Sequence, residues 1–273
     1  MEPMSFPGSE ATPPGGAYHS YLGDSSAPLV GLYFTLPLFI VYHAGLWWLK
    51  TFAGLRWANA VDIAIADFFA LFGVAGPLLS FMLVISVFLV LQTVSGRRTR
   101  RPPLHTWIFM LTESLILSLP VFMLSRLTLK LGDYVNQPFL AVQEGIGELS
   151  WRANLILGCG AGVYEEFFFR LLVMGAASLV LDKVFGIRDW RKFFLAAAFQ
   201  ALLFALSHHL PGGPEALDGL EGIRAALPAL VFRTAAGLYF AFIYLERGFG
   251  IAAGSHASYD LLVVWLDSLT FGG

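Results

Sequence analysis

The stretch VYEEFFFRLL, residues 163–172, places two adjacent carboxylates and a guanidinium inside a long apolar run. These ionisable groups belong to Glu165, Glu166 and Arg170. A charged side chain within a membrane span is costly, so it usually faces the interior of a helix bundle or a water-filled cavity. The stretch therefore predicts a membrane-embedded helix that carries a functional site.

The composition of the chain is that of an integral membrane protein. Of its 273 residues, 57% are hydrophobic and 13% are charged, whereas soluble domains are about 45–50% apolar and about 25% charged. The net charge of −2 argues against a nucleic-acid partner and against a polybasic membrane anchor. The single cysteine, Cys159, excludes an intrachain disulfide and a multi-cysteine metal cluster. We therefore expect the lipid bilayer to surround the chain.

The first residues differ in composition from the rest. Residues 1–26 are rich in Pro, Gly and Ser and contain no Lys or Arg. A signal peptide needs a basic region before its apolar core, so we expect a disordered tail here and not a leader. Residues 27–273 are expected to form a single integral membrane domain.

Seven apolar windows approach or exceed the length of about 20 residues that crosses a bilayer as a helix. They are 28–49, 74–94, 106–125, 153–181, 192–210, 225–245 and 249–268. The segment 57–73 contains two aspartates and is expected to lie at the interface or to form an eighth span. Residues 126–152 suit an amphipathic or re-entrant segment. The sequence thus predicts an all-α, polytopic transmembrane bundle of about seven to eight spans.

Polar side chains in the late windows are spaced to meet on a shared helix face. Glu166 and Arg170 are four residues apart, with the acid N-terminal, which favours pairing. Glu165 is rotated from Glu166 by about 100°. His256 and Asp260, in GSHASYD, are also four residues apart. We therefore expect the arginine to hold one carboxylate, while the other faces a cavity that the histidine and the aspartate also line.

His208 follows Phe204 by four residues in FALSHH, and it can meet the other groups only through tertiary packing. By the window boundaries, this histidine lies near one end of its span. Either the fifth or the seventh helix is then shifted, tilted or broken, and the glycines at Gly248, Gly250 and Gly254 favour the seventh. Carboxylates and imidazoles around a water-filled cavity are suited to activating water and to stabilising an oxyanion. This combination predicts peptide-bond hydrolysis.

The motifs EEFFFR (165–170), FALSH (204–208) and HASYD (256–260) occur in this order on successive late windows. Together they resemble the pattern of the CAAX protease and bacteriocin-processing family, which includes the Ras-converting endopeptidase and the bacterial Abi proteins. The resemblance covers about 150–268. It implies an intramembrane glutamic endopeptidase that processes a membrane-associated protein or peptide, with C-terminal processing expected. We expect such an enzyme in a bacterial cell membrane.

The resemblance also implies roles for the motif residues. Glu165 would activate water with help from His208, while His256 and Asp260 would form the oxyanion site. Glu166 and its arginine would support that arrangement. At the position of the aspartate the family commonly has Asn, and an Asp must be protonated before it can donate to an oxyanion.

Several other classes have weaker support. Zinc could be bound by His208, His256 and a Glu, but the HExxH spacing is absent, so we expect no metal and no other cofactor. The Gly-x-Ser-Gly motif of rhomboid-like serine proteases and the Gly-x-Gly-Asp motif of presenilin-like proteases are absent as well. A non-catalytic immunity or scaffold protein, a proton-coupled transporter and a zinc metalloprotease remain alternatives. A scaffold has no physical need for both histidines and a free carboxylate, so we favour the enzyme.

Overall fold

A computed structural model describes residues 21–54, 58–96, 102–134, 151–209 and 219–271. Every element in these ranges is helical, which confirms the predicted all-α class. The first half of the chain forms α2 (Pro28–Phe52), α3 (Ala60–Ala70), α4 (Leu79–Ser95) and α5 (Leu104–Tyr134). The second half forms α7 (Trp151–Glu165), the π-helix η1 (Glu166–Met174), α8 (Gly175–Lys183), α9 (Trp190–Ser207), α10 (Gly219–Arg247) and α11 (Phe249–Phe271).

Four of the described helices are long and apolar enough to cross a membrane. They are α2, residues 104–130 of α5, α9, and residues 226–247 of α10. The predicted segment 57–73 contains α3, which has 11 residues. This length is too short to cross a bilayer. The interfacial interpretation therefore fits α3, whereas an eighth span does not. The amphipathic segment expected at 126–152 begins as a continuation of α5, while residues 135–150 lie outside the described part of the chain.

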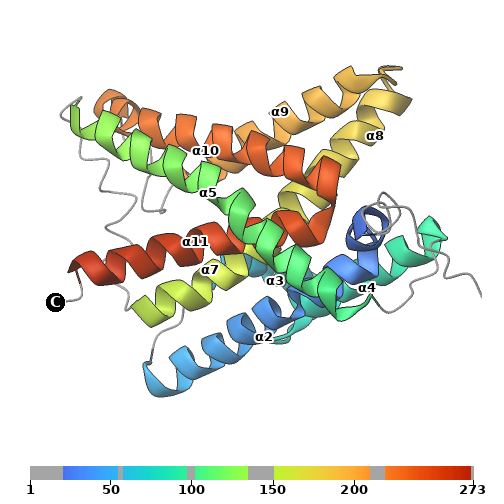
Figure 1. Cartoon of the computed structure of the whole chain (residues 1–273), viewed down its shortest axis with the longest axis horizontal. Helices are drawn as coiled ribbons and strands as arrows, with labels where there is room; N and C mark the ends of the chain where they lie inside the picture. Colours follow the sequence, from blue (N-terminus) through green and yellow to red (C-terminus); the bar gives the residue numbers. More distant parts are fainter. Residues whose placement is uncertain (1–20, 55–57, 97–101, 135–150, 210–218, 272–273) are drawn as a thin grey trace, which may run out of the picture.

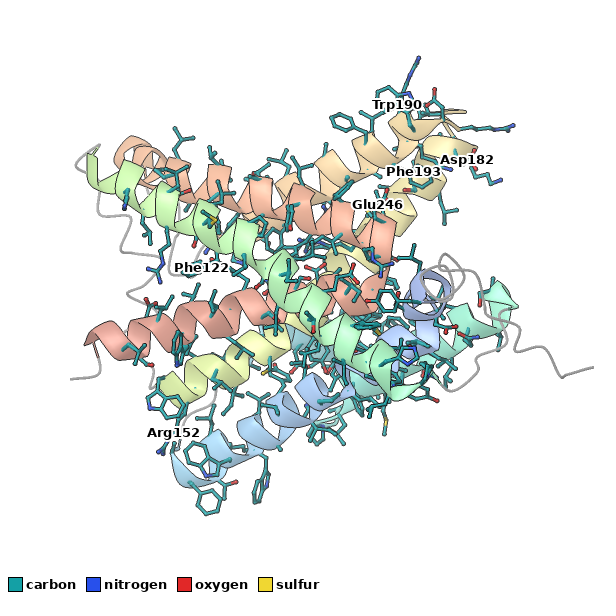
Figure 2. All side chains as sticks on the ribbon, viewed as in Figure 1. Phe122, Arg152, Asp182, Trp190, Phe193 and Glu246 are labelled. Atoms are coloured by element: carbon teal, nitrogen blue, oxygen red, sulfur yellow. The ribbon has the colours of Figure 1, made fainter. Side chains whose placement is uncertain are left out.

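The outer surface of the bundle is apolar. Ile40 and Phe52 of α2 and Phe242 of α10 are each at least 60% exposed. A soluble protein rarely exposes large contiguous apolar patches, whereas lipid tails accommodate them. Figure 2 shows side chains projecting outward along the helices, with the exposed Trp190 at the outer end of α9 and the charged Arg152 far from it, at the start of α7. Aromatic and basic side chains are enriched near membrane surfaces, so this placement fits a membrane domain.

In Figure 1, α7, η1 and α8 follow one another along a single diagonal of the molecule. Helix α11 lies beside α7, and α9 lies beside α8 and α10. The chain turns from α10 into α11 at Gly248, whose φ of +80° is a conformation that glycine adopts without steric cost. Just after this turn, Gly250 of α11 lies against Gly31 of α2. The helix with the third motif is therefore enclosed by other helices.

Helices α7 and α11 approach each other closely because α7 presents glycines one turn apart. A Cβ atom added at Gly162 would lie 2.6 Å from the backbone nitrogen of Ala257. A Cβ atom added at Gly158 would lie 3.0 Å from the Cβ atom of Asp260. Small residues at a spacing of four are a common interface of membrane helices because they let two backbones come close. This contact brings the two adjacent glutamates of α7 and η1 next to the third motif.

Replacing Gly162 by Ala is expected to destabilise the protein by about 1–3 kcal/mol, because the added methyl group meets backbone atoms that cannot move independently. The measurement is the unfolding temperature in detergent. Gly175→Ala is the matched control, since a Cβ atom there meets nothing within 4 Å and alanine favours a helix over glycine. Equal unfolding temperatures for the two variants would contradict the close packing of α7 on α11.

The tail expected at residues 1–26 does not extend to residue 26. Residues 21–25 are helical, and residues 1–20 lie outside the described part of the chain. The hydroxyl of Tyr21 donates to Glu113 of α5 at 2.5 Å, and an Nη atom of Arg247 donates to Ser25 at 3.1 Å. The same arginine forms an ion pair with the glutamate. These contacts fasten the beginning of the described chain to α5 and to the end of α10.

Candidate active site

The two adjacent glutamates lie where the helix changes its hydrogen-bonding pattern. Glu165 is the last residue of α7, and Glu166 begins the π-helix η1. Such i→i+5 turns are rare and often occur at functional sites. From the sequence, a shift, tilt or break is expected in the fifth or the seventh window, with the seventh favoured. Helix α11 is continuous from Phe249 to Phe271, so the seventh window contains no break. The irregular helical segment is therefore the one that carries the carboxylates.

Arg170 and Glu166 form an ion pair that is completely buried. The Nε atom of the arginine lies 3.2 Å from Oε2 of the glutamate, and neither side chain is exposed. The guanidinium also lies over the rings of Phe204 and Phe240, at 4.6 and 5.6 Å from their centroids. Within the described residues, neither Nη atom has a hydrogen-bond partner. The positive charge is thus balanced by one carboxylate and by two aromatic faces.

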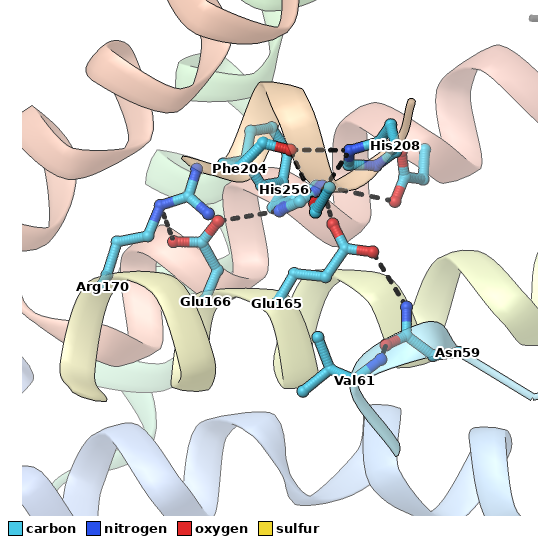
Figure 3. Close-up of polar contacts among 10 residues, drawn as sticks. Asn59, Val61, Glu165, Glu166, Arg170, Phe204, His208 and His256 are labelled. Atoms are coloured by element: carbon cyan, nitrogen blue, oxygen red, sulfur yellow. Dashed lines mark hydrogen bonds and ion pairs between the residues drawn. The ribbon is translucent and has the colours of Figure 1, made fainter. Parts of the chain in front are cut away.

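His256 lies at the centre of the polar cluster in Figure 3. Its Nδ1 atom is 2.8 Å from Oε1 of Glu166, while its Nε2 atom lies 3.9 Å from Oε2 of Glu165 and 3.7 Å from Oδ2 of Asp260. The imidazole stacks on the ring of Phe240 at 4.6 Å. Since an ionised carboxylate can only accept, Nδ1 carries a proton when Glu166 is ionised, and Nε2 faces the other two carboxyl groups.

This geometry refines the sequence-based expectation for the two glutamates. Glu166 contacts both the arginine and the histidine, whereas Glu165 points toward the second nitrogen of the histidine. The stacking of Phe240 on His256 could not be anticipated, because an aromatic residue in an apolar helix carries no signal of its own.

Asn59 is a member of the cluster that sequence reasoning missed. Its Nδ2 atom donates to Oε1 of Glu165 at 2.9 Å (Figure 3). It precedes the apolar run of α3, and an Asn in this position is a recognisable sign of a helix start. That sign predicts a cap for α3 but says nothing about the glutamate, which lies 106 residues further along the chain.

His208 forms the C-cap of α9, at the end of the helix as the sequence indicated. Its Nδ1 atom lies 2.8 Å from the carbonyl oxygen of Phe204. Because a carbonyl oxygen only accepts, Nδ1 carries the proton, and in the neutral ring Nε2 carries the lone pair. The ring of Phe204 packs edge-on against both His208 and His256, with centroids 5.0 and 6.2 Å apart. This phenylalanine therefore joins the second motif to the third.

The described residues contain no group of three His, Cys, Asp or Glu side chains arranged to hold a metal ion. Of the zinc set considered from the sequence, His256 directs Nδ1 to Glu166, so Nε2 is the nitrogen that could face a metal ion.

Comparisons with known proteins are consistent with the motifs. Residues 148–262 match the family model described as Type II CAAX prenyl endopeptidase Rce1-like. The match contains all three motifs and confirms the resemblance inferred from them. The comparisons with curated proteins and with solved structures find no match. Asn59 lies outside the matched residues.

Proposed function

We propose that the chain is a glutamate-activated intramembrane endopeptidase, because residues 148–262 match the Rce1-like family model of type II CAAX prenyl endopeptidases. Its substrate is a membrane-associated protein or peptide, cleaved near the C-terminus. The enzyme is a multi-pass protein of the bacterial cell membrane, with α4, α7–η1–α8 and α11 adding to the four long apolar spans.

The observation that carries this proposal is the cluster formed by the buried Glu166 and His256 with the partly buried Glu165 and Asp260. Three carboxyl groups around one imidazole are costly in a low-dielectric interior unless they are paired, so such a cluster indicates a function. Structural ion pairing accounts for Glu166, which Arg170 holds. It does not account for Glu165 or Asp260, each of which directs an oxygen toward the same nitrogen of the histidine.

The proposed reaction begins with a water molecule beside Glu165. The carboxylate takes a proton from the water, and the resulting hydroxide attacks the carbonyl carbon of the scissile peptide bond. The lone pair on Nε2 of His208 helps to orient the water. Glu165 then delivers its proton to the leaving amine. General acid–base steps of this kind typically contribute about 10²–10⁴ in rate.

The negative oxygen of the tetrahedral intermediate needs hydrogen-bond donors. We assign this role to Nε2 of His256 and to Asp260. The histidine already directs Nδ1 to Glu166, so donation from Nε2 requires the imidazolium form. Glu166, Glu165 and Asp260 all direct carboxyl oxygens toward this imidazole. Asp260 donates only when it is protonated. Preorganised donors of this kind are commonly worth about 10²–10³ in rate each.

The test is cleavage of a quenched fluorescent peptide with a farnesylated CAAX C-terminus by the purified protein in lipid nanodiscs. We expect cleavage, and we expect activity to survive exhaustive chelation, since the proposed nucleophile is activated by a carboxylate. An unprenylated peptide of the same sequence shows whether the lipid group is recognised. Near-stoichiometric zinc, with activity lost on chelation and restored by zinc, would make the histidines ligands and overturn the mechanism. A protein that cleaves neither peptide would favour the scaffold alternative.

A further inference from the structure

Asn59 connects the first half of the chain to the carboxylate that the proposed mechanism uses as a base. It donates from Nδ2 to Oε1 of Glu165 at 2.9 Å, and only 9% of the residue is exposed. The asparagine lies outside the segment 148–262 that matches the family model. This contact therefore belongs to this chain's own N-terminal half and is not part of the three motifs.

The orientation of the Asn59 amide is set by a second hydrogen bond. Its Oδ1 atom accepts from the backbone N–H of Val61 at 2.9 Å and so caps the N-terminus of α3. An amide side chain has one accepting oxygen and one donating nitrogen. With the oxygen committed to the helix, the NH₂ group must face Glu165, and a flipped amide would break both contacts. The glutamate oxygen that it meets is therefore an acceptor.

The backbone of Asn59 is held by a polar network that returns to α7. Its N–H group donates to the hydroxyl of Tyr42 at 2.8 Å, and this hydroxyl donates to Oδ2 of Asp62, also at 2.8 Å. Asp62 accepts a further hydrogen bond from Ser80 of α4, whose oxygen lies 3.0 Å from the hydroxyl of Tyr164. Tyr164 immediately precedes the catalytic carboxylate. The asparagine is thus fixed from α2, α3, α4 and α7.

We propose that Asn59 is a positioning residue that binds Oε1 of Glu165 and leaves Oε2, the oxygen nearest Nε2 of His256, to take the proton from water. The role of Glu165 as the base rests on the proposed function, whereas the hydrogen bond from Asn59 to Glu165 is observed in the structure. A carboxylate held at one oxygen loses rotational freedom, so its second oxygen points toward the water more of the time. Positioning of this kind lowers the barrier of the chemical step, because the orientation entropy is already lost before the reaction begins.

Several ionisable groups surround the Glu165 carboxylate. Glu166 and Arg170 follow it in η1, and His256 and Asp260 face it from α11. Two further groups lie nearby: His208 ends α9 beside the cluster, and Asp62 of α3 is linked to the asparagine through one tyrosine hydroxyl. Asn59 contacts the carboxylate without adding a charge. Replacing it by a carboxylate would add one in direct contact.

Two substitutions at Asn59 separate positioning from helix capping. Ser and Asp are about as good as Asn at the N-cap of a helix, so Asn59→Ser and Asn59→Asp both preserve the start of α3. Asn59→Ser removes the amide donor, and cleavage of the farnesylated peptide is expected to fall about tenfold to a hundredfold, as for loss of a hydrogen bond to a charged group. In Asn59→Asp the cleavage rate is expected to fall further. The acid limb of its pH–rate profile is expected to move to higher pH, because two adjacent carboxylates do not both ionise readily.

A second readout does not depend on the substrate. The infrared band of the protonated Glu165 carboxyl group is identified by its loss in Glu165→Gln. In Asn59→Asp this band is expected to appear at a higher pH than in the parent. If the pH–rate profile and the pH of the band are both unchanged in Asn59→Asp, Asn59 is only a cap and the inference is overturned.

The two readouts also separate the inference from the proposed function. If the band moves but neither the parent nor the variants cleave any peptide, the proposed function fails and the contact stands. If Glu165→Gln cleaves as well as the parent, the base is misassigned. Unfolding temperatures close to that of the parent, measured for both Asn59 variants, establish that lost activity is not lost folding.

Discussion

Glu165→Gln is expected to lower the cleavage rate by about 10²–10⁴-fold, which is the usual contribution of a general base. The amide has nearly the same volume as the carboxylate, and its oxygen can still accept the hydrogen bond from Asn59. The substitution therefore keeps the packing and removes the group that takes the proton. The measurements are kcat and KM for the farnesylated CAAX peptide in nanodiscs. We expect the loss to appear in kcat, because the substitution acts on the chemical step.

The matched control is Glu246→Gln, which makes the same change at an exposed carboxylate near the end of α10. We expect this variant to keep the activity and the unfolding temperature of the parent. Full activity of Glu165→Gln would exclude the glutamate as the base. If the biological activity of the protein also persisted in that variant, the non-catalytic scaffold interpretation would be favoured.

Arg170→Ala is expected to lower the free energy of unfolding by about 3–5 kcal/mol, the usual cost of removing one partner of a buried ion pair. The variant leaves Glu166 without its counter-ion at a position that is completely buried. It also removes the cation that lies over the rings of Phe204 and Phe240. Because Glu166 holds Nδ1 of His256, activity is expected to fall together with stability. Chemical unfolding in detergent and peptide cleavage measure the two effects.

Two further variants separate the ion pair from a general effect of losing an arginine. Arg152→Ala, at an exposed position near the start of α7, is expected to change little. The double variant Arg170→Met with Glu166→Gln removes both charges and is expected to regain much of the stability without regaining the activity. An Arg170→Ala protein as stable and as active as the parent would show that the pair contributes to neither.

The all-α class, the helices of the seven windows and two of the site's pairs are predictable from the sequence. The pairs Glu166–Arg170 and His256–Asp260 each lie four residues apart, so the helix itself places their side chains on one face. The resemblance carried by the three motifs is likewise a property of the sequence. These features are local, because they depend on hydrophobic periodicity and on spacing within one helix.

The contacts between segments were decided only by the tertiary structure. Sequence spacing could not select Glu166 as the carboxylate that meets Nδ1 of His256, nor place Phe240 on the face of that histidine. It also gave no sign that Asn59 would reach Glu165. These contacts join residues far apart in the chain. The contact of Glu166 with His256 forms where Gly162 lets the backbones of α7 and α11 approach closely. The helical period determines which side chains share a face, whereas the packing of one helix on another determines what that face meets.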